Sequence, residues 1–195
     1  MDKPGSAASI SSSKKKLTLL VLSNQPSVGK SRWIYRISNQ ASRSQNNKSG
    51  GSVGGERSAR FLPTLGFDVT QRKTPAGLPG LQVLTFYEIG GLASLQSLWP
   101  GYLLDSDGVI FMATTLDDLD TFRQKVLPSA RKSLLLLLDS NTIQSHHIAD
   151  LVQMQRTIKV VPFDPVHSYN DLSLISWFQQ PDQKETTTIN ATQIL

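Results

Sequence analysis

The chain has 195 residues, enough for one domain with a real hydrophobic core. Its 38% hydrophobic and 18% charged residues are typical of a globular protein, and apolar runs such as 134–138 are far shorter than the roughly 18 residues that cross a bilayer. Because there is no cysteine, disulfides, thiolate zinc sites and thiol nucleophiles are excluded. We expect a cytoplasmic protein that is held together by its core alone.

The net charge of +5 conceals an asymmetry along the chain. Residues 1–73 carry 13 Lys/Arg and 3 Asp/Glu, a net +10, whereas the remainder carries 7 and 12, a net −5. The basic residues are scattered among Ser, Asn and Gly with few aromatics to stack on bases, which argues against nucleic acid as a partner. A solvated surface or an acidic protein partner fits them better. With no glycine at position 2 and no cysteine near the end, we expect no direct lipid anchor.

The first third of the chain contains one strand and one helix. Residues 1–15 are small and polar and predict a disordered tail. The apolar run at 17–22 predicts a strand buried on both faces of a parallel sheet, and a helix is expected from about 30 to 40. Residues 39–60 contain almost nothing that could be buried, so we expect a flexible insertion in the domain.

The rest of the chain alternates between strands and helices. An extended segment at 67–72, a turn-rich link at 74–80 and a strand at 81–89 suggest a hairpin. Further strands are expected at 108–113, 134–139 and 158–161, and helices at about 116–130, 143–154 and 169–179. This alternation predicts an α/β fold, a three-layer, doubly wound, mostly parallel sheet of about six strands with helices on both faces. The domain should span 16–179, followed by a polar tail at 180–195.

The segment NQPSVGKS at 24–31 directly follows the first strand and opens the first helix. This pattern is typical of a phosphate-binding P-loop in which Asn24 replaces the first glycine. In such a loop backbone N–H groups surround a phosphate, Lys30 neutralises its oxygens and the Ser31 hydroxyl ligates Mg²⁺. The alternative is that Gly29-Lys30-Ser31 only caps a helix after a turn. The candidate phosphate-binding residues are Asn24, Gln25, Pro26, Ser27, Val28, Gly29, Lys30, Ser31 and Arg32.

Two further motifs follow the P-loop in the order that a known family has them. PTLGFDV at 63–69 and YEIGGL at 87–92 resemble the first switch (Pro-Thr-Ile-Gly-Phe) and the second switch (Asp-x-Gly-Gly-Gln) of Arf-like and Rab-like small GTPases. LWPGY at 98–102 and DGVIF at 107–111 resemble that family's next helix and strand, so the likeness covers about residues 17–178. The resemblance implies a small G domain that binds GTP or GDP with Mg²⁺.

The resemblance also implies roles for individual residues. Ser31 and Thr64 would ligate Mg²⁺, Glu88 would hold it through water, and the Gly91 amide would contact the γ-phosphate. Each motif also has a simpler interpretation, a turn before an edge strand for Thr64 and a strand end that needs a free φ for Gly91.

The sequence departs from this family at the hydrolytic and base-binding positions. Leu92 replaces the glutamine that orients the attacking water, so hydrolysis should be slow whether Leu92 is exposed or packed. The guanine-binding Asn-Lys-x-Asp is replaced by DSNTIQ at 139–144, in which Asp139 or Asn141 could take the asparagine position but neither alignment supplies the aspartate. Base recognition is therefore expected to be atypical.

Two smaller features allow more than one interpretation. Phe163, in the segment that replaces the second base-contacting loop, could stack on a base or anchor a buried loop. The adjacent pair His146 and His147 points in directions about 100° apart on a helix and has no third ligand nearby, so we expect a surface pair rather than a metal site.

These features predict a nucleotide-binding, largely non-hydrolytic switch or scaffold subunit. Its partner, which could be a coiled coil, would dock on the surface around Thr64, Phe67 and Trp99, although Trp99 could instead belong to the core. Within the family, the resemblance extends to the Rab-like subunit of the intraflagellar transport B complex, which would place the protein at a cilium or flagellum. The alternatives are a conventional Arf-like GTPase whose partner completes the catalytic site and a nucleotide-free pseudo-GTPase.

Overall fold

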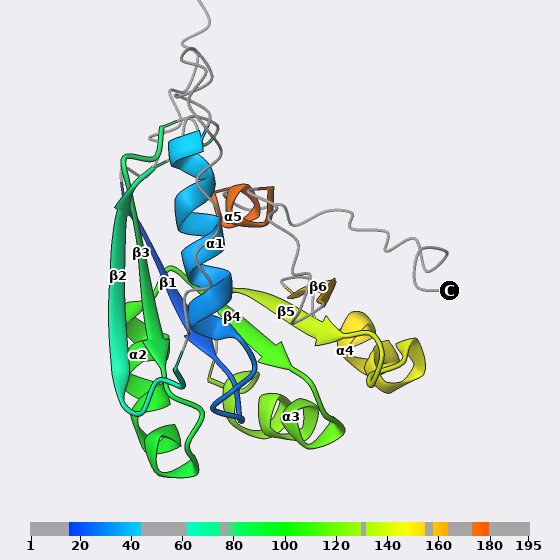
Figure 1. Cartoon of the computed structure of the whole chain (residues 1–195). Helices are drawn as coiled ribbons and strands as arrows, with labels where there is room; N and C mark the ends of the chain where they lie inside the picture. The colour runs from blue at the N-terminus through cyan, green and yellow to red at the C-terminus, as the bar shows by residue number, and fades with distance from the viewer. Residues whose placement is uncertain are drawn as a thin grey trace, which may run out of the picture.

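A computed structural model describes residues 16–43, 62–74, 78, 80–129, 132–154, 158–163 and 173–179 of the chain (Figure 1). Six strands form one sheet in the order β2-β3-β1-β4-β5-β6. Their bounds are Lys16–Leu22 (β1), Phe67–Lys73 (β2), Val83–Ile89 (β3), Gly108–Ala113 (β4), Ser133–Asp139 (β5) and Ile158–Phe163 (β6).

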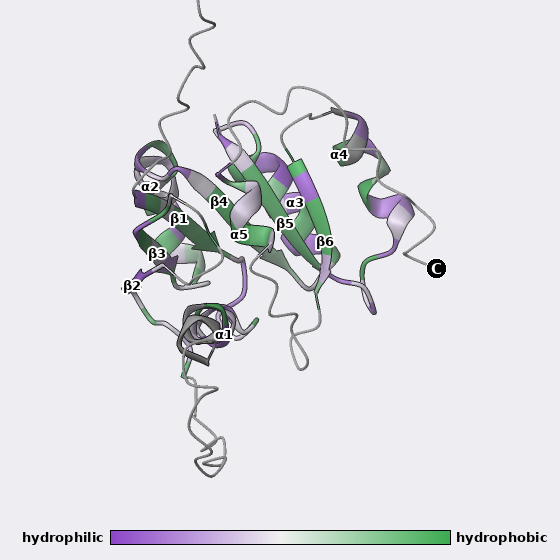
Figure 2. Ribbon diagram, turned by 90° about the horizontal axis from the view of Figure 1, so that it is seen from above, coloured by the Kyte–Doolittle hydropathy of each residue, from purple (hydrophilic) through white to green (hydrophobic). Residues whose placement is uncertain are grey.

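The direction of the strands agrees with the alternation in the sequence. Strand β2 pairs with β3 in the antiparallel sense, which confirms the expected hairpin, and the other four pairings are parallel. Parallel strands covered on both faces need apolar side chains in both directions, which is why β1, β4 and β5 are almost continuously hydrophobic (Figure 2). The predicted doubly wound, mostly parallel α/β sheet is confirmed.

Helices cover both faces of the sheet and form two separate hydrophobic clusters. On one face α1 (Lys30–Arg43) and α5 (Ser173–Trp177) pack on alternate residues of the central strands, with Trp33 against Phe86 at the centre. On the other face α2 (Trp99–Asp105), α3 (Leu116–Thr121) and α4 (Ala149–Met154) cover the intervening residues. Successive side chains of one strand therefore enter different clusters.

The helix that was expected at about 116–130 is shorter and irregular. A capping box between Thr115 and Asp118 starts α3, which continues after Thr121 into one turn of π-helix, η2 (Phe122–Val126). Within this part, Arg123 reaches across to α4 and donates two hydrogen bonds to the Asp150 carboxylate, at 2.8 and 3.1 Å. The regular α-helix thus ends at Thr121, and the π-helical turn that follows carries the Arg123–Asp150 contact.

Other element boundaries differ by a few residues from the expected ones. Strand β3 starts at Val83 rather than 81, and β6 runs on to Phe163 rather than 161. The helix expected from 143 begins with a 3₁₀ turn, η3 (Ser145–Ile148), because the amides of Thr142 and Ile143 donate to the Asp139 carbonyl and form a turn first. Another 3₁₀ segment, η1 (Ala93–Leu98), precedes α2.

Several expectations for the ends and the insertion lie outside the described residues. These are the tails at 1–15 and 180–195 and most of the insertion at 39–60, whose first five residues belong to α1 because that helix continues to Arg43. Among the described helices, none has the length and hydrophobicity needed to cross a membrane.

The contact between Gly108 and Phe178, which directly follows α5, gives a test of the packing. A Cβ on Gly108 would lie 2.3 and 2.5 Å from Cδ1 and Cε1 of the buried Phe178 ring. We expect Gly108→Ala to lower the free energy of unfolding by about 1–3 kcal/mol, measured by urea denaturation. Gly101→Ala is the matched control, since Gly101 lies in α2 with open space around its Cα, and should raise stability by up to about 1 kcal/mol. Equal stability of the two variants would contradict this packing.

Candidate functional site

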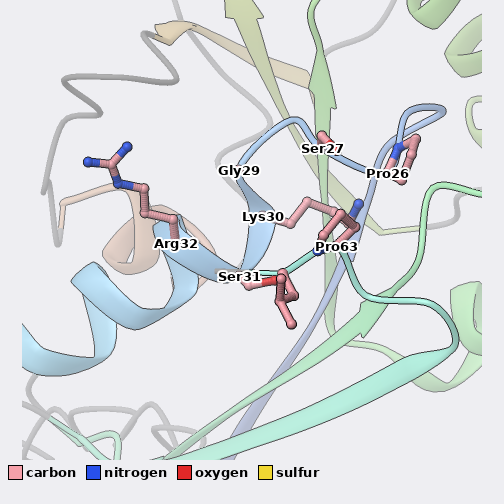
Figure 3. A pocket seen from close by; sticks show the side chains of 8 residues that line it. Pro26, Ser27, Gly29, Lys30, Ser31, Arg32 and Pro63 are labelled. Atoms are coloured by element: carbon pink, nitrogen blue, oxygen red, sulfur yellow. The ribbon is translucent and has the colours of Figure 1, made fainter. Parts of the chain in front are cut away.

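The loop between β1 and α1 borders a small open cavity at the carboxyl edge of the sheet. Gly29 adopts a φ of 90°, which favours glycine and lets the chain turn into α1. The cavity, of about 110 Å³, is lined by Pro26, Ser27, Gly29, Lys30, Ser31, Arg32, Leu62 and Pro63 (Figure 3). It has room for phosphate groups but is smaller than the roughly 300–1,000 Å³ pockets that enclose whole small molecules.

Lys30 carries a buried charge at the inner end of this loop. Its side chain is 2% exposed, and Nζ donates to the Ser23 hydroxyl at 2.6 Å and to the Gln25 carbonyl at 3.5 Å. Burial lowers the pKa of the Lys30 ammonium from 10.5 to about 8, while the charges of Glu88 and Asp118 raise it. The ammonium is therefore held in place by few groups and is poorly solvated, so an incoming anion would be strongly attracted to it.

Three oxygen-bearing side chains from different elements meet beside Lys30. Ser31 Oγ, in the first turn of α1, donates to Glu88 Oε1 at 2.8 Å, and Thr64 Oγ1, in the segment before β2, donates to the same oxygen at 2.7 Å. The two hydroxyls are 3.3 Å apart. The structure thus brings together the three residues that the sequence assigned to Mg²⁺.

Two adjacent glycines at the end of β3 allow very close backbone contacts. A Cβ on Gly91 would lie 2.1 Å from the backbone of Gln25, and one on Gly90 would lie 2.2 Å from the Thr64 carbonyl. The Gly90 amide also donates to the Gly66 carbonyl at 2.7 Å. The glycine pair therefore presses the second-switch segment against the phosphate loop and the first-switch segment.

Not all candidate residues reach the cavity. Asp139 and Asn141 are absent from its lining, and the Asp139 carboxylate caps its own turn by accepting the Asn141 amide at 3.0 Å. Val28 contributes its side chain to the core, so only its backbone could contact a ligand. Arg32 lies on the rim with its guanidinium pointing away from Lys30 (Figure 3).

Several residues of this region escaped the sequence interpretation. Ser23 anchors Lys30, and Gln96 and Asp117 both bind the Asn24 side chain. Their spacing in sequence gave no signal, since the pairs are up to 93 residues apart. The position of Asp118 could have been predicted from the sequence, because Thr115 and Asp118 form the Thr-x-x-Asp pattern that is typical of a helix start.

The proposed partner surface needs one correction. Trp99 is 1% exposed and packs edge-to-face on Phe111 with ring centroids 6.1 Å apart, so it belongs to the core and cannot contact a partner. Phe67 is 55% exposed and remains on the surface, with its ring 6.0 Å from that of Tyr102. Trp99 is buried because it opens α2 and packs that helix against the sheet.

The structure also decides between interpretations that the sequence left open. Leu92 is 39% exposed and is therefore not packed in the core. Phe163 is 3% exposed and belongs to the hydrophobic cluster on the face covered by α1 and α5, which favours the buried anchor over a base-stacking role. His146 and His147 lie on η3 with ring centroids 3.9 Å apart, and the part of the chain that the structure describes contains no group of three or more His, Cys, Asp or Glu side chains placed to hold a metal ion.

Comparison with known proteins finds relatives at low sequence identity. No family model matches the chain. ADP-ribosylation factor-like protein 4A from Homo sapiens, Mus musculus and Bos taurus is 21% identical over 121 residues, which is 62% of this chain and 59% of each relative. The chain thus covers less than two thirds of the length of these relatives. With the six-stranded sheet and the loop before α1, this similarity identifies the fold as that of a P-loop small G domain.

The pKa of Lys30 leads to a pH-dependent stability. Because the pKa of Lys30 is about 8 in the folded chain and 10.5 for an ordinary lysine, the unfolded chain binds more protons between these pH values. The free energy of unfolding should then rise with pH from about 8 to 10.5, by up to about 1.4 kcal/mol per pH unit from this group. Urea denaturation at several pH values should show this component in the native chain and in Lys73→Met, an exposed control, but not in Lys30→Met. The same slope in all three would refute the assignment.

Proposed function

We propose that the protein binds a guanine nucleotide with Mg²⁺ through the loop at 24–31 and acts as a switch or scaffold subunit of a protein complex. The main support for this proposal is that Ser31, Thr64 and Glu88 form hydrogen bonds with one another next to the buried ammonium of Lys30. Thr64 precedes β2 and Glu88 is the second-last residue of β3, whereas Lys30 and Ser31 open α1. A site assembled from such distant segments is difficult to explain as a helix cap alone.

The side chains present fit both parts of this ligand. Mg²⁺ prefers oxygen donors, and Ser31, Thr64 and Glu88 offer two hydroxyls and a carboxylate at one place. Lys30 would contribute the cation, and the loop would contribute backbone N–H groups at the start of a 14-residue helix. When bound, Mg²⁺ would neutralise part of the phosphate charge, while the three oxygen donors orient it.

Fewer observations support recognition of the base than support binding of the phosphates and Mg²⁺. The similarity to Arf-like proteins supports guanine as the base, whereas the Asp139 carboxylate is already used in its own turn. Gln144, which takes the aspartate position when Asn141 is aligned with the family's asparagine, caps η3 with His147. We therefore propose that phosphates and Mg²⁺ provide most of the affinity, and that discrimination between guanine and adenine is weak.

In the proposed role the protein stays in its nucleotide-bound state for a long time and does not hydrolyse GTP rapidly. Leu92 occupies the position of the water-orienting glutamine, and an aliphatic side chain can neither donate to nor accept from water. The surface around Thr64 and Phe67 would bind the protein partner, for which we propose a coiled coil. The narrower assignment to intraflagellar transport, with a location at a cilium or flagellum, stays a prediction from the sequence resemblance.

Removal of Lys30 tests the binding proposal. We expect Lys30→Ala to lose bound nucleotide, because the variant lacks the cation buried beside the phosphate loop. The measurement is mass spectrometry of nucleotides released on denaturation from purified full-length protein, which reports occupancy, base and phosphate number together. Lys73→Ala, which removes an exposed lysine, should retain the native content.

Two outcomes would count against the proposal. A native protein that releases no nucleotide, and that stays empty at micromolar GTP with Mg²⁺, would support the nucleotide-free alternative. Equal content in Lys30→Ala and native protein would mean that the ligand is held elsewhere.

Restoring the missing glutamine tests the slow-turnover proposal. Leu92→Gln should raise single-turnover GTP hydrolysis at least about tenfold, because the new amide can orient water, and should leave nucleotide affinity nearly unchanged. Leu98→Gln, which changes a similarly exposed leucine, is the control. If the native chain already hydrolyses as fast as the variant, or is stimulated by orders of magnitude by cell extract, the conventional Arf-like alternative is favoured.

A further inference from the structure

A chain of four side chains links the phosphate loop to η1 and to the helical segment formed by α3 and η2. Lys125 in η2 donates to Gln96 Oε1, and Gln96 Nε2 in η1 donates to Asn24 Oδ1 at 2.6 Å. Asn24 Nδ2 in turn donates to Asp117 Oδ2 in α3 at 2.8 Å. Both ends of this relay lie on the surface, whereas Asn24 and Gln96 are half-buried.

The chemistry of the two ends fixes the direction of every bond. A lysine ammonium can only donate, so Gln96 must present its oxygen to Lys125 and its nitrogen to Asn24. The Asp117 carboxylate can only accept, so Asn24 must present its nitrogen to it. Both amide dipoles therefore point the same way between a cation and an anion, an arrangement in which each hydrogen bond polarises and strengthens the next.

The relay meets the phosphate loop at the residue next to the Lys30 anchor. Asn24 follows Ser23, whose hydroxyl accepts from Lys30 Nζ and donates to the Gln25 carbonyl at 2.6 Å. Gln96 lies five residues after Gly91, which presses against Gln25. The segment that contains Gly91 and η1 is thus attached to the loop at two points, by backbone packing at one end and by the Asn24–Gln96 bond at the other.

We infer that the Asn24–Gln96 hydrogen bond is a latch that holds η1 on the phosphate loop and pre-organises the second switch for a nucleoside triphosphate. The role follows from geometry, because the Asn24 side chain accepts from Gln96 in η1 and donates to Asp117 in α3. A ligand gains affinity when the groups that it contacts are already ordered. The latch itself rests on the hydrogen bonds, whereas its effect on nucleotides rests on the proposed function.

Hydrogen exchange of η1 tests the latch without any nucleotide. The Leu95 amide donates to the Leu92 carbonyl at 2.9 Å and reports whether η1 is formed. In full-length protein freed of nucleotide, Gln96→Leu should raise the exchange rate of this amide roughly threefold to tenfold, the effect of losing one ordinary hydrogen bond. Asn24→Ala should do the same, and the double variant should add little because both changes break the same Asn24–Gln96 bond.

The matched control is Gln71→Leu, which removes a glutamine amide from the exposed face of β2, where it donates to Thr85 Oγ1 at 3.5 Å. It should leave exchange in η1 unchanged. Lys125→Met should weaken the latch and Lys125→Arg, which still donates, should restore it. Unchanged exchange of Leu95 in both Gln96→Leu and Asn24→Ala, or fully additive effects in the double variant, would overturn the latch.

Nucleotide affinity tests its consequence. Gln96→Leu should weaken GTP binding threefold to tenfold and leave GDP binding within twofold, because only the third phosphate is expected to reach the Gly91 amide. An equal loss for both nucleotides would overturn the proposed pre-organisation for a triphosphate. If the native chain binds neither nucleotide, the proposed function fails while faster exchange of Leu95 still supports the latch.

Discussion

The buried ammonium of Lys30 is the interaction on which the site depends. A charge with 2% of its surface exposed is costly unless nearby groups compensate for the lost water, and this ammonium has one hydroxyl, one distant carbonyl and the fields of two carboxylates. Each of these groups comes from a different point at the same edge of the sheet. Ser23 directly follows β1, Glu88 is the second-last residue of β3, and Asp118 lies in the first turn of α3, which follows β4. The position of Lys30 therefore requires the correct register of three neighbouring strands.

The doubly wound architecture supplies that register. Leu20 pairs with Tyr87 in β3 and with Val109 in β4, so the ends of these parallel strands reach the same edge together. Binding sites of open α/β sheets form at this edge, where loops leave strands that are themselves rigid. Hydrophobic clusters on both faces fix the strands, and the close packing of Gly90 and Gly91 then fixes the loops. Stability and placement of the site have the same origin in this fold.

How much the sequence could predict depended on how local each signal was. The strands, the phosphate loop and the set of Ser31, Thr64 and Glu88 were predictable, because apolar runs, glycine spacing and motif order are visible along the chain. Trp99 was ambiguous, since a tryptophan after a switch segment is compatible with a surface anchor and with a core anchor, and only the position of Phe111 in space decides. The contacts of Asn24 with Gln96 and Asp117 could not be predicted, because they join residues 72 and 93 positions apart.

Two of the departures from the small-GTPase motifs lie on either side of one contact. Asn24 stands where the P-loop has its first glycine, and Leu92 stands directly after Gly91, which packs on Gln25. The first departure adds a hydrogen bond that holds the second-switch segment, and the second removes the group that would orient water. Under the proposed function both act in the same direction, since one favours the bound triphosphate and the other slows its loss. With the Asn24–Gln96 bond alone, the second-switch segment would be held but hydrolysis would still be rapid. With Leu92 alone, hydrolysis would be slow but the segment would be mobile. Under the proposed function, the combination would favour a long-lived bound state, as a scaffold subunit requires.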